Sequence, residues 1–424
     1  MKVLFASFAG ITHFLPMVPM AWALRTAGHD VLVASQPDLT ETIVEAGLTA
    51  APVGRADWMN DDPWAEDLLG DILWPGAGYV QAFDFPGHEP ERWTWESLLT
   101  LERIMVPALY ASMNNDAMME DLIDLARSWR PDLVLWETYT FSGAVAARVA
   151  GAAHARMILG PNVALRVRRA FLRELAAQPP DRREDPTREW LGWTLERFGR
   201  HFDEEIVTGQ WTIDATPPSM RLDTGVHTLG TRFVPHTPGT VPHWLREPAD
   251  RPRVCFTMGL TELSRVLGDS LGDCLRALAA VDGEVIMTLA EEDLAGVPEV
   301  PANVRLVGFV PLHEVLPTCS AVVHGAGAAT RAAAQIHGVP QISIGSGWDT
   351  VVEAERLEEL GAGVCLPLER LTEETLRESL LRVLNDPAFT KAAGELRQEV
   401  MSLPTPNETI PAIERLAAER RSTA

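Results

Sequence analysis

The stretch "SAVVHGAGAATRAAAQIHGVPQISIG", residues 320–345, predicts a strand, a turn, a helix and a second strand. Its first and last residues form short apolar runs typical of buried strands. Between them, small residues after His324 suit a turn, and the alanine-rich run that follows favours a helix. Strands joined by a helix pair in parallel, and helices then cover both faces of the sheet. The stretch therefore predicts an α/β fold.

The same alternation of strands and helices occurs on both sides of this stretch. Further apolar runs are "KVLFASF" (2–8), "GHDVLVAS" (28–35), "PDLVLWE" (131–137), "RVCFTMG" (253–259), "GEVIMTLA" (283–290), "NVRLVGFV" (303–310) and "AGVCLP" (362–367). A proline-rich segment, residues 231–252, interrupts the pattern as linkers do. We expect a Rossmann-like domain at 1–236, a linker at 237–252, a second Rossmann-like domain at 253–395, and a helical tail at 396–424 that could pack back on the first domain.

Composition excludes several classes of partner. The 424 residues carry a formal net charge of −23, whereas nucleic acids and anionic membranes are bound chiefly by clustered Lys and Arg. No apolar run approaches the roughly 20 residues needed to span a bilayer. The N-terminus lacks a signal-peptide pattern. The four cysteines form no C-x-x-C pair, so we expect reduced core thiols and a location in the cytoplasm.

The turn after His324 resembles a phosphate cradle. It lies between a predicted strand and a predicted helix, where small residues let an anion approach the helix-start N–H groups. A dinucleotide motif, G-x-G-x-x-G, would need glycine at the position of Thr330, and it would open the chain. A tight turn without a ligand is the remaining structural alternative.

Several motifs resemble one enzyme family, the GT-B nucleotide-sugar glycosyltransferases. In the second half these are "VRLVGFVPLHEVLPTCSAVVH", "HGAGAAT", "HGVPQ" and "GWDTVVEAERLEELGAG". In the first half they are "ITHFLPMVPMAWALRTAGHDVLVASQPDL", "MNND" and "WRPDLVLWETYTFSGAVAARVAGAAHARMILGP", with "RPRVCFTMGLTELS" after the linker. Together they resemble the antibiotic-type, family 1-like enzymes that attach dTDP-deoxysugars to polyketide aglycones such as macrolides and anthracyclines. The resemblance implies two domains whose parallel sheets face each other across a deep cleft.

The family implies an inverting displacement with a general base, and His13 matches that base. An acceptor hydroxyl is a poor nucleophile at neutral pH, and histidine is suited to accept its proton. Related enzymes carry an acidic residue after the "PDLVL"-type strand to orient the base, and Glu137 holds that place here. A solvated loop histidine and a surface carboxylate are the alternatives.

The resemblance also assigns donor-binding residues. Phe309 and Val310 would meet the thymine, Gly259 and Thr261 the phosphates, and Asp349 and Thr350 the sugar hydroxyls. The diphosphate would lie against a group formed by His324, Gly325, Gly327, Ala328, Ala329 and Thr330. One departure is Ala329, which stands where the family pattern offers a hydroxyl. The chain has no Asp-x-Asp metal clamp, so we expect metal-independent transfer and no cofactor.

The acceptor and protein partners are less defined. Residues 55–100 are rich in Trp and Asp, and their tryptophans could pack on a flat aglycone or staple an irregular segment. The branch that the chain resembles works with a helical auxiliary protein related to haem monooxygenases. Such a protein and a second copy of the chain are the candidate protein partners. The alternatives in function are a GT-B relative that acts as a nucleotide-sugar epimerase or lipid glycosyltransferase, and a non-catalytic relative.

Overall fold

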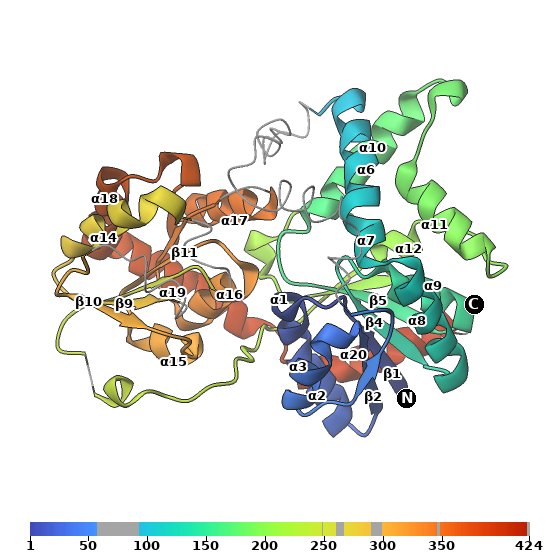
Figure 1. The fold of residues 1–424 in the computed structure, drawn as a ribbon, viewed down its shortest axis with the longest axis horizontal. Helices are drawn as coiled ribbons and strands as arrows, with labels where there is room; N and C mark the ends of the chain where they lie inside the picture. Colours follow the sequence, from blue (N-terminus) through green and yellow to red (C-terminus); the bar gives the residue numbers. More distant parts are fainter. Residues whose placement is uncertain (57–92, 248, 260–266, 290–298, 346–347, 422–424) are drawn as a thin grey trace. The chain divides into compact units, whose positions relative to one another are not determined.

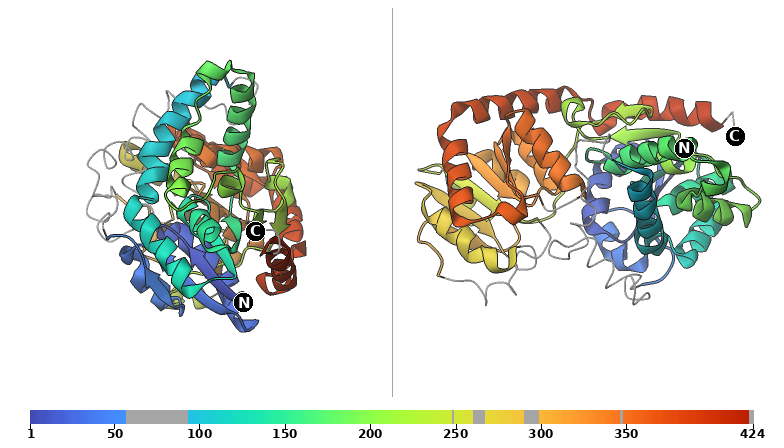
Figure 2. Two further views of the ribbon diagram at one scale, coloured as in Figure 1. Left: turned by 90° about the vertical axis from the view of Figure 1, so that its right-hand side faces the viewer. Right: turned by 90° about the horizontal axis from the view of Figure 1, so that it is seen from above.

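The structure is a computed structural model that describes residues 1–56, 93–247, 249–259, 267–289, 299–345 and 348–421 (Figure 1). The chain divides into two compact units. The N-terminal unit comprises residues 1–215, 222–231 and 404–424, and the C-terminal unit comprises 216–221 and 232–403. Both chain ends therefore belong to the N-terminal unit (Figures 1 and 2).

The N-terminal unit is built on a parallel sheet with the strand order β3-β2-β1-β4-β5-β6-β7. Its strands are β1 (Lys2–Ala6), β2 (Asp30–Ser35), β3 (Ala50–Pro52), β4 (Leu133–Glu137), β5 (Ala153–Ile158), β6 (Trp211–Asp214) and β7 (Thr228–Gly230). Its helices include α1 (Ile11–Phe14), α2 (Val18–Thr26), α3 (Thr40–Glu45), α6 (Trp95–Met105), α7 (Ala111–Met113), α8 (Asp116–Trp129), α9 (Phe141–Ala150), α10 (Val163–Ala177), α11 (Pro186–Glu196), α12 (Glu205–Thr208) and α20 (Pro406–Arg421).

Burial on both faces explains why these strands are almost entirely apolar. Val3 and Phe5 of β1 belong to a core cluster that also contains residues of α2 and α20. From α20 this cluster takes Ile410, Ile413, Leu416 and Ala417. The last helix of the chain is thus part of the N-terminal unit's core. The predicted start of the tail at 396 falls inside α19 (Pro387–Ser402), which belongs to the C-terminal unit.

The C-terminal unit has a second parallel sheet, in the order β10-β9-β8-β11-β12-β13. Its strands are β8 (Arg253–Thr257), β9 (Glu284–Thr288), β10 (Val304–Val307), β11 (Ala321–His324), β12 (Gln341–Ser343) and β13 (Gly363–Cys365). Its helices include α14 (Leu271–Ala279), α15 (Leu312–Val315), α16 (Ala328–His337), α17 (Trp348–Glu359), α18 (Glu373–Asn385) and α19. The opening sequence stretch folds as predicted, into β11, α16 and β12.

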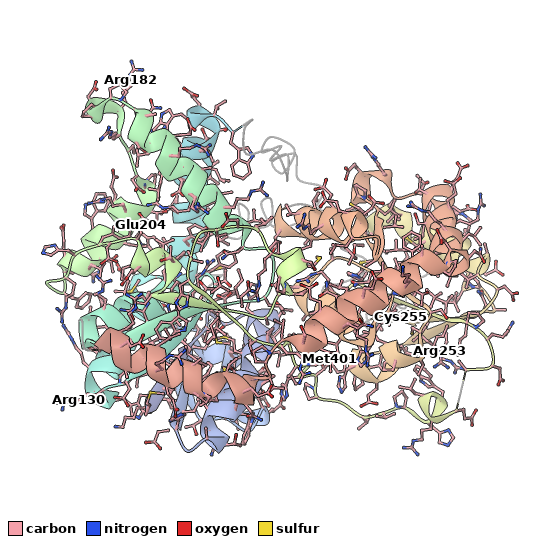
Figure 3. The ribbon with its side chains drawn as sticks, turned by 180° about the vertical axis from the view of Figure 1, so that it is seen from behind. Arg130, Arg182, Glu204, Arg253, Cys255 and Met401 are labelled. Carbon is pink, nitrogen blue, oxygen red and sulfur yellow. The ribbon has the colours of Figure 1, made fainter. Side chains whose placement is uncertain are left out.

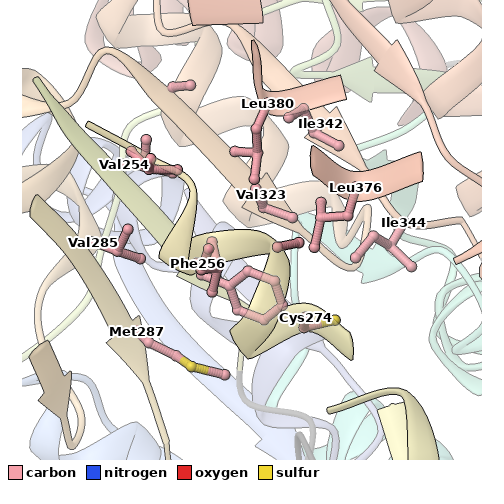
Figure 4. Packing of buried hydrophobic residues seen from close by; sticks show 14 of the residues in the cluster. Val254, Phe256, Cys274, Val285, Met287, Val323, Ile342, Ile344, Leu376 and Leu380 are labelled. Carbon is pink, nitrogen blue, oxygen red and sulfur yellow. The ribbon is translucent and has the colours of Figure 1, made fainter. Parts of the chain in front are cut away.

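The core of this unit joins its sheet to α14 and α18 (Figure 4). Phe256, Val323 and Ile342, from three neighbouring strands, pack with Cys274 of α14 and Leu380 of α18. Each of these side chains is completely or almost completely buried. Cys274 is a free thiol, as are the other three cysteines. The predicted α/β class with two parallel-sheet domains is confirmed.

Within the described ranges, no helix is both long and apolar enough to cross a membrane.

Candidate functional site

The N-terminal unit places His13 just beyond the carboxyl end of β1. The strand ends at Ala6, and Gly10 is the N-cap of the short helix α1 that carries the histidine. The imidazole is about half-buried, with 39% of its side chain exposed. Its ring lies 4.8 Å from the ring of Phe8, centroid to centroid. His13 thus combines a packed ring with access to solvent.

Glu137 is hydrogen-bonded to His13. It is the last residue of β4, which pairs with β1, and the register sets Ala6 opposite Trp136. The loops after both strands therefore meet at one edge of the sheet. The His13 Nδ1 to Glu137 Oε1 distance is 2.8 Å, and the Glu137 side chain is buried. A carboxylate oxygen accepts, so this bond puts a proton on Nδ1 and leaves Nε2 of a neutral ring with its lone pair.

The second carboxylate oxygen of Glu137 is also engaged. It accepts the backbone N–H of Tyr139 at 2.9 Å and the hydroxyl of Thr140 at 3.1 Å. The same Thr140 hydroxyl oxygen accepts the backbone N–H of Phe8 at 2.9 Å. Thr140 therefore ties the carboxylate to the loop that carries the histidine. Three donors hold Glu137 in one orientation.

Two buried amides fix the surrounding loops. Gln36 accepts the N–H of Ala9 at 2.7 Å and donates to the carbonyl of Met113 at 3.1 Å. Asn114 donates to the carbonyl of Tyr139 at 2.8 Å and accepts the N–H of Ser142 at 2.9 Å. Sequence analysis missed Thr140, Gln36 and Asn114 as individual residues. Each lies inside a motif that carried the family resemblance, which was the available signal.

The residues expected on the acceptor side are described only in part. Residues 57–92, most of the Trp- and Asp-rich insertion, lie outside the described ranges. At its end, Trp95 stacks on Phe171 with ring centroids 5.4 Å apart, and Trp93 is buried with Arg166 over its ring. These two tryptophans pack against the protein, which agrees with the alternative that the tryptophans hold an irregular segment in place.

In the C-terminal unit, the predicted cradle lies where β11 meets α16. His324 ends the strand, residues 325–327 form the turn, and Gly327 is the N-cap of the helix. Gly327 has φ −59° and ψ 133°, which other residues adopt, and apart from its chain neighbours an added Cβ would meet no atom of the described residues within 4 Å. Neither backbone conformation nor packing therefore demands glycine there. Open space at a helix start is what an approaching phosphate group requires.

The structure corrects the predicted role of the His324 side chain. The ring is completely buried, its Nε2 lies 2.8 Å from Gln341 Oε1, and its Nδ1 accepts the N–H of Ala326 at 3.0 Å. Burial lowers the pKa of His324 to about 4, so the ring is neutral. With both nitrogens bonded inside the protein, the side chain holds the turn rather than reaching toward a ligand.

The unusual residue of the turn is Ala326 rather than Ala329. Ala326 has φ +57°, a left-handed conformation that costs a residue with a Cβ roughly 1–2 kcal/mol. The hydrogen bond from its N–H to His324 helps to hold that conformation. Ala329 lies in the ordinary first turn of α16, directly before Thr330. The cradle therefore consists of backbone and small side chains.

The structure brings Gly259 close to the start of α16. It follows β8, which pairs with β11 so that Thr257 lies opposite His324. A Cβ on Gly259 would lie 3.6 Å from the Thr330 hydroxyl, and its φ of +75° favours glycine. Its N–H donates to the Thr257 hydroxyl at 3.1 Å, so that N–H is engaged within the protein. Thr261 lies outside the described ranges.

The other predicted donor residues follow neighbouring strands of the same sheet. Phe309 and Val310 come after β10; Phe309 is exposed and Val310 is buried. Asp349 and Thr350 lie in the first turn of α17, after β12, and both are half-buried. Since β10 and β12 stand on opposite sides of β8 and β11, the residues are spread along one edge of the sheet. Within the part of the chain that the structure describes, no three His, Cys, Asp or Glu side chains form a group suited to a metal ion.

Comparisons with protein families match both halves of the chain. Residues 22–259 match the model of the erythromycin biosynthesis protein CIII-like N-terminal domain. Residues 273–416 match the model of the corresponding C-terminal domain. The two matches together cover most of the chain.

Individual relatives match over nearly the full length. The 10-deoxymethynolide desosaminyltransferase of Streptomyces venezuelae is 48% identical, over 99% of this chain and 98% of its own. The 3-alpha-mycarosylerythronolide B desosaminyl transferase of Saccharopolyspora erythraea is 45% identical, over 99% of each chain. Among solved structures, the glycosyltransferase VinC in complex with dTDP is 35% identical, with a TM-score of 0.83 over 99% of this chain and all of that one.

Proposed function

Because the chain belongs to the erythromycin biosynthesis protein CIII-like family and is a glycosyltransferase of the GT-B fold, we propose that it moves a deoxysugar from a dTDP-sugar to a polyketide hydroxyl with inversion. The bond between the anomeric carbon and the diphosphate breaks as the acceptor oxygen bonds to that carbon. The products are the glycoside, dTDP and one proton.

His13 takes that proton. The bond from Nδ1–H to Glu137 leaves Nε2 free of a proton, and 39% of the side chain is exposed for an acceptor to approach. When Nε2 is protonated, the buried carboxylate of Glu137 stabilises the positive charge that forms on the ring. A positioned base of this kind typically contributes about 10²–10⁴ to the rate. The His13–Glu137 hydrogen bond is the observation that carries the proposal.

The leaving diphosphate is held at the start of α16. The first-turn N–H groups of any α-helix lack partners within the helix, and the helix dipole favours negative charge there. Gly327, Ala328 and Ala329 place no large side chain in front of these groups. Preorganised donors of this kind stabilise charge that develops in the transition state. We propose that transfer proceeds without a metal ion.

The names of the relatives support a substrate class. Two of them are desosaminyl transferases and a solved neighbour is in complex with dTDP, which supports a dTDP-deoxysugar donor, aminodeoxysugars included. Their acceptors, 10-deoxymethynolide and 3-alpha-mycarosylerythronolide B, make a macrolide the first acceptor to try. We place the enzyme in the cytoplasm, with a helical auxiliary protein and a second copy of the chain as protein partners.

The test is direct transfer in vitro. The purified protein is incubated with a panel of dTDP-deoxysugars and macrolide or anthracycline aglycones, with chelator present, and the products are identified by mass spectrometry. The proposal predicts a glycoside for at least one pair, and an anomeric configuration opposite to that of the donor by NMR. Retained configuration would contradict inversion, and activity only after metal addition would contradict the metal-free step.

A parallel assay addresses the auxiliary protein. The same panel is repeated with a helical protein of the haem monooxygenase fold added in equal amount. The proposal predicts a large gain in turnover upon addition. Full turnover by the purified chain alone would remove the auxiliary protein from the account.

A further inference from the structure

A buried ion pair joins the two helices that begin at the donor edge. Arg331 of α16 and Glu353 of α17 contact each other through Nε and Oε2 at 2.6 Å and through Nη2 and Oε1 at 3.0 Å. Both side chains are at most 2% exposed. The remaining guanidinium nitrogen, Nη1, donates to Gln335 at 3.2 Å. None of these three residues belongs to the proposed donor contacts.

The position of the pair relates it to the donor. Arg331 lies one helical turn after Gly327, the start of the diphosphate cradle, and its own N–H donates to the Gly327 carbonyl at 3.0 Å. Glu353 lies one turn after Asp349, which is assigned to the sugar. The pair therefore ties α16 to α17 about 6 Å behind the start of each helix.

The geometry of the pair suits it to hold α16 and α17 in a fixed relative position. A single hydrogen bond would let the helices slide or rotate, whereas two parallel bonds between a planar fork and a carboxylate fix both. Burial raises the pKa of Glu353 to about 7, while the Arg331 charge opposes that rise. The negative charge of Asp349 adds to the rise in the pKa of Glu353.

Stability alone does not account for such a pair. Removing two charges from water is costly, and apolar residues of similar volume often stabilise a protein equally well. We propose that the Arg331–Glu353 pair fixes the start of α17 relative to the start of α16, and so sets the sugar of the bound donor relative to its diphosphate. This rests on the proposed function, which assigns Asp349 and Thr350 to the sugar.

The experiment separates positioning from stability by replacing both charges together. Arg331→Met combined with Glu353→Leu removes the pair without leaving a buried charge. We expect dTDP to bind within threefold of wild type by calorimetry, because the residues assigned to its thymine and diphosphate lie outside α17. With the dTDP-deoxysugar that wild type uses, kcat/KM falls by about 10²-fold, since a misplacement of about 1 Å can cost that much.

The same unit offers a matched control. Arg253 and Glu284 are the first residues of β8 and β9, and the Arg253 Nε and Nη2 contact Glu284 Oε2 at 2.9 and 2.8 Å (Arg253 is labelled in Figure 3). Arg253 is 3% exposed, and the pair lies at the end of the sheet opposite the donor edge. Arg253→Met with Glu284→Leu should leave both dTDP binding and kcat/KM within threefold of wild type.

A conservative variant covers the case in which the double variant does not fold. Arg331→Lys keeps the charge but loses the two-pronged contact, so we expect the same split between dTDP affinity and kcat/KM, smaller in size. Wild-type kcat/KM in a folded variant would overturn the proposal. So would equal losses in dTDP affinity and kcat/KM. A loss of kcat/KM in the Arg253 control as large as that in the Arg331 variant would overturn it as well. If wild type transfers no sugar from the panel, the proposed function fails instead, before any variant is compared.

Discussion

The carboxyl edges of the two sheets each carry a histidine, and the two rings have opposite environments. His13, after β1, is 39% exposed and bonds a carboxylate through Nδ1. His324, at the end of β11, is completely buried, and both of its nitrogens are bonded to neutral groups. A carboxylate can stabilise a positively charged imidazole, whereas burial with neutral partners keeps it uncharged. The comparison teaches that the first edge is suited to proton transfer and the second to holding a backbone cradle.

Among substitutions that keep both histidines, the largest effect is expected from changing the partner of His13. In Glu137→Gln, the amide group cannot face the Tyr139 N–H and the Thr140 hydroxyl without conflict, so it faces Nδ1. The ring then carries its proton on Nε2, the wrong tautomer for a base. We expect kcat to fall about 100-fold, with dTDP affinity unchanged. Glu137→Asp, which keeps the charge, should lose less; equal kcat in wild type and Glu137→Gln would break the comparison.

The next effect concerns the cradle. Gly327→Ala adds a methyl group that no other part of the described structure contacts within 4 Å, so the fold should be unchanged while the methyl obstructs the diphosphate. We expect the Kd for dTDP to rise about tenfold, or about 1.4 kcal/mol, by calorimetry. Gly394→Ala in α19 is the matched control, because its added Cβ also meets nothing within 4 Å. Identical dTDP affinities for the two variants would remove Gly327 from the cradle.

A smaller effect is expected from removing the hydroxyl of Thr140 while keeping the shape of its side chain. Thr140→Val removes the donor to Glu137 and the acceptor for the Phe8 N–H, so two buried hydrogen bonds are lost. We expect a fivefold to tenfold loss in kcat, and a loss of about 1–3 kcal/mol in the free energy of unfolding. Thr140→Ser keeps the hydroxyl and should stay within threefold of wild-type kcat. If valine and serine behave alike, the hydroxyl does not position Glu137.

The smallest effect is on the pH dependence of stability. The pKa of His324 is 6.5 in an ordinary environment and about 4 in the folded protein, so the unfolded chain binds more protons between these values. Its contribution to stability is therefore complete above pH 6.5 and is lost as the pH falls toward 4. From pH 7.5 to 5.5 this amounts to about 1 kcal/mol.

His324→Gln should reduce the loss of stability over that range by the same amount. Urea titrations at the two pH values check this. At each urea concentration, unfolding around His324 is followed by a short pulse of hydrogen–deuterium exchange at one fixed pH, read on peptides that cover β11. An unchanged pH dependence in the variant would mean that His324 is not the neutral group described here.

The fold was largely predictable because buried parallel strands are continuous apolar runs. The apolar runs in the sequence predicted β1, β2, β4 and every strand of the second sheet. β5, "AHARMI", was not singled out, since His154 and Arg156 interrupt its apolar run although both are buried. Their burial depends on partners outside the strand: the Trp136 ring nitrogen for His154, and Asn162 for Arg156.

For the candidate site, the sequence predicted which residues take part but not how their side chains are arranged. The resemblance named His13 and Glu137, and strand order then brought them together across β1 and β4. Sequence could not show that Thr140 ties Glu137 to the loop that carries His13, that Ala326 adopts a left-handed conformation, or that His324 faces inward. These features depend on three-dimensional contacts that neither composition nor periodicity encodes.

The most direct test of the account is the single-turnover rate of His13→Ala, measured with saturating dTDP-deoxysugar and aglycone alongside dTDP calorimetry on the same preparation. The account predicts a rate at least about 10³-fold below wild type, with a Kd for dTDP within threefold of wild type. Transfer within tenfold of wild type would contradict it, because the proton would then leave the acceptor without His13.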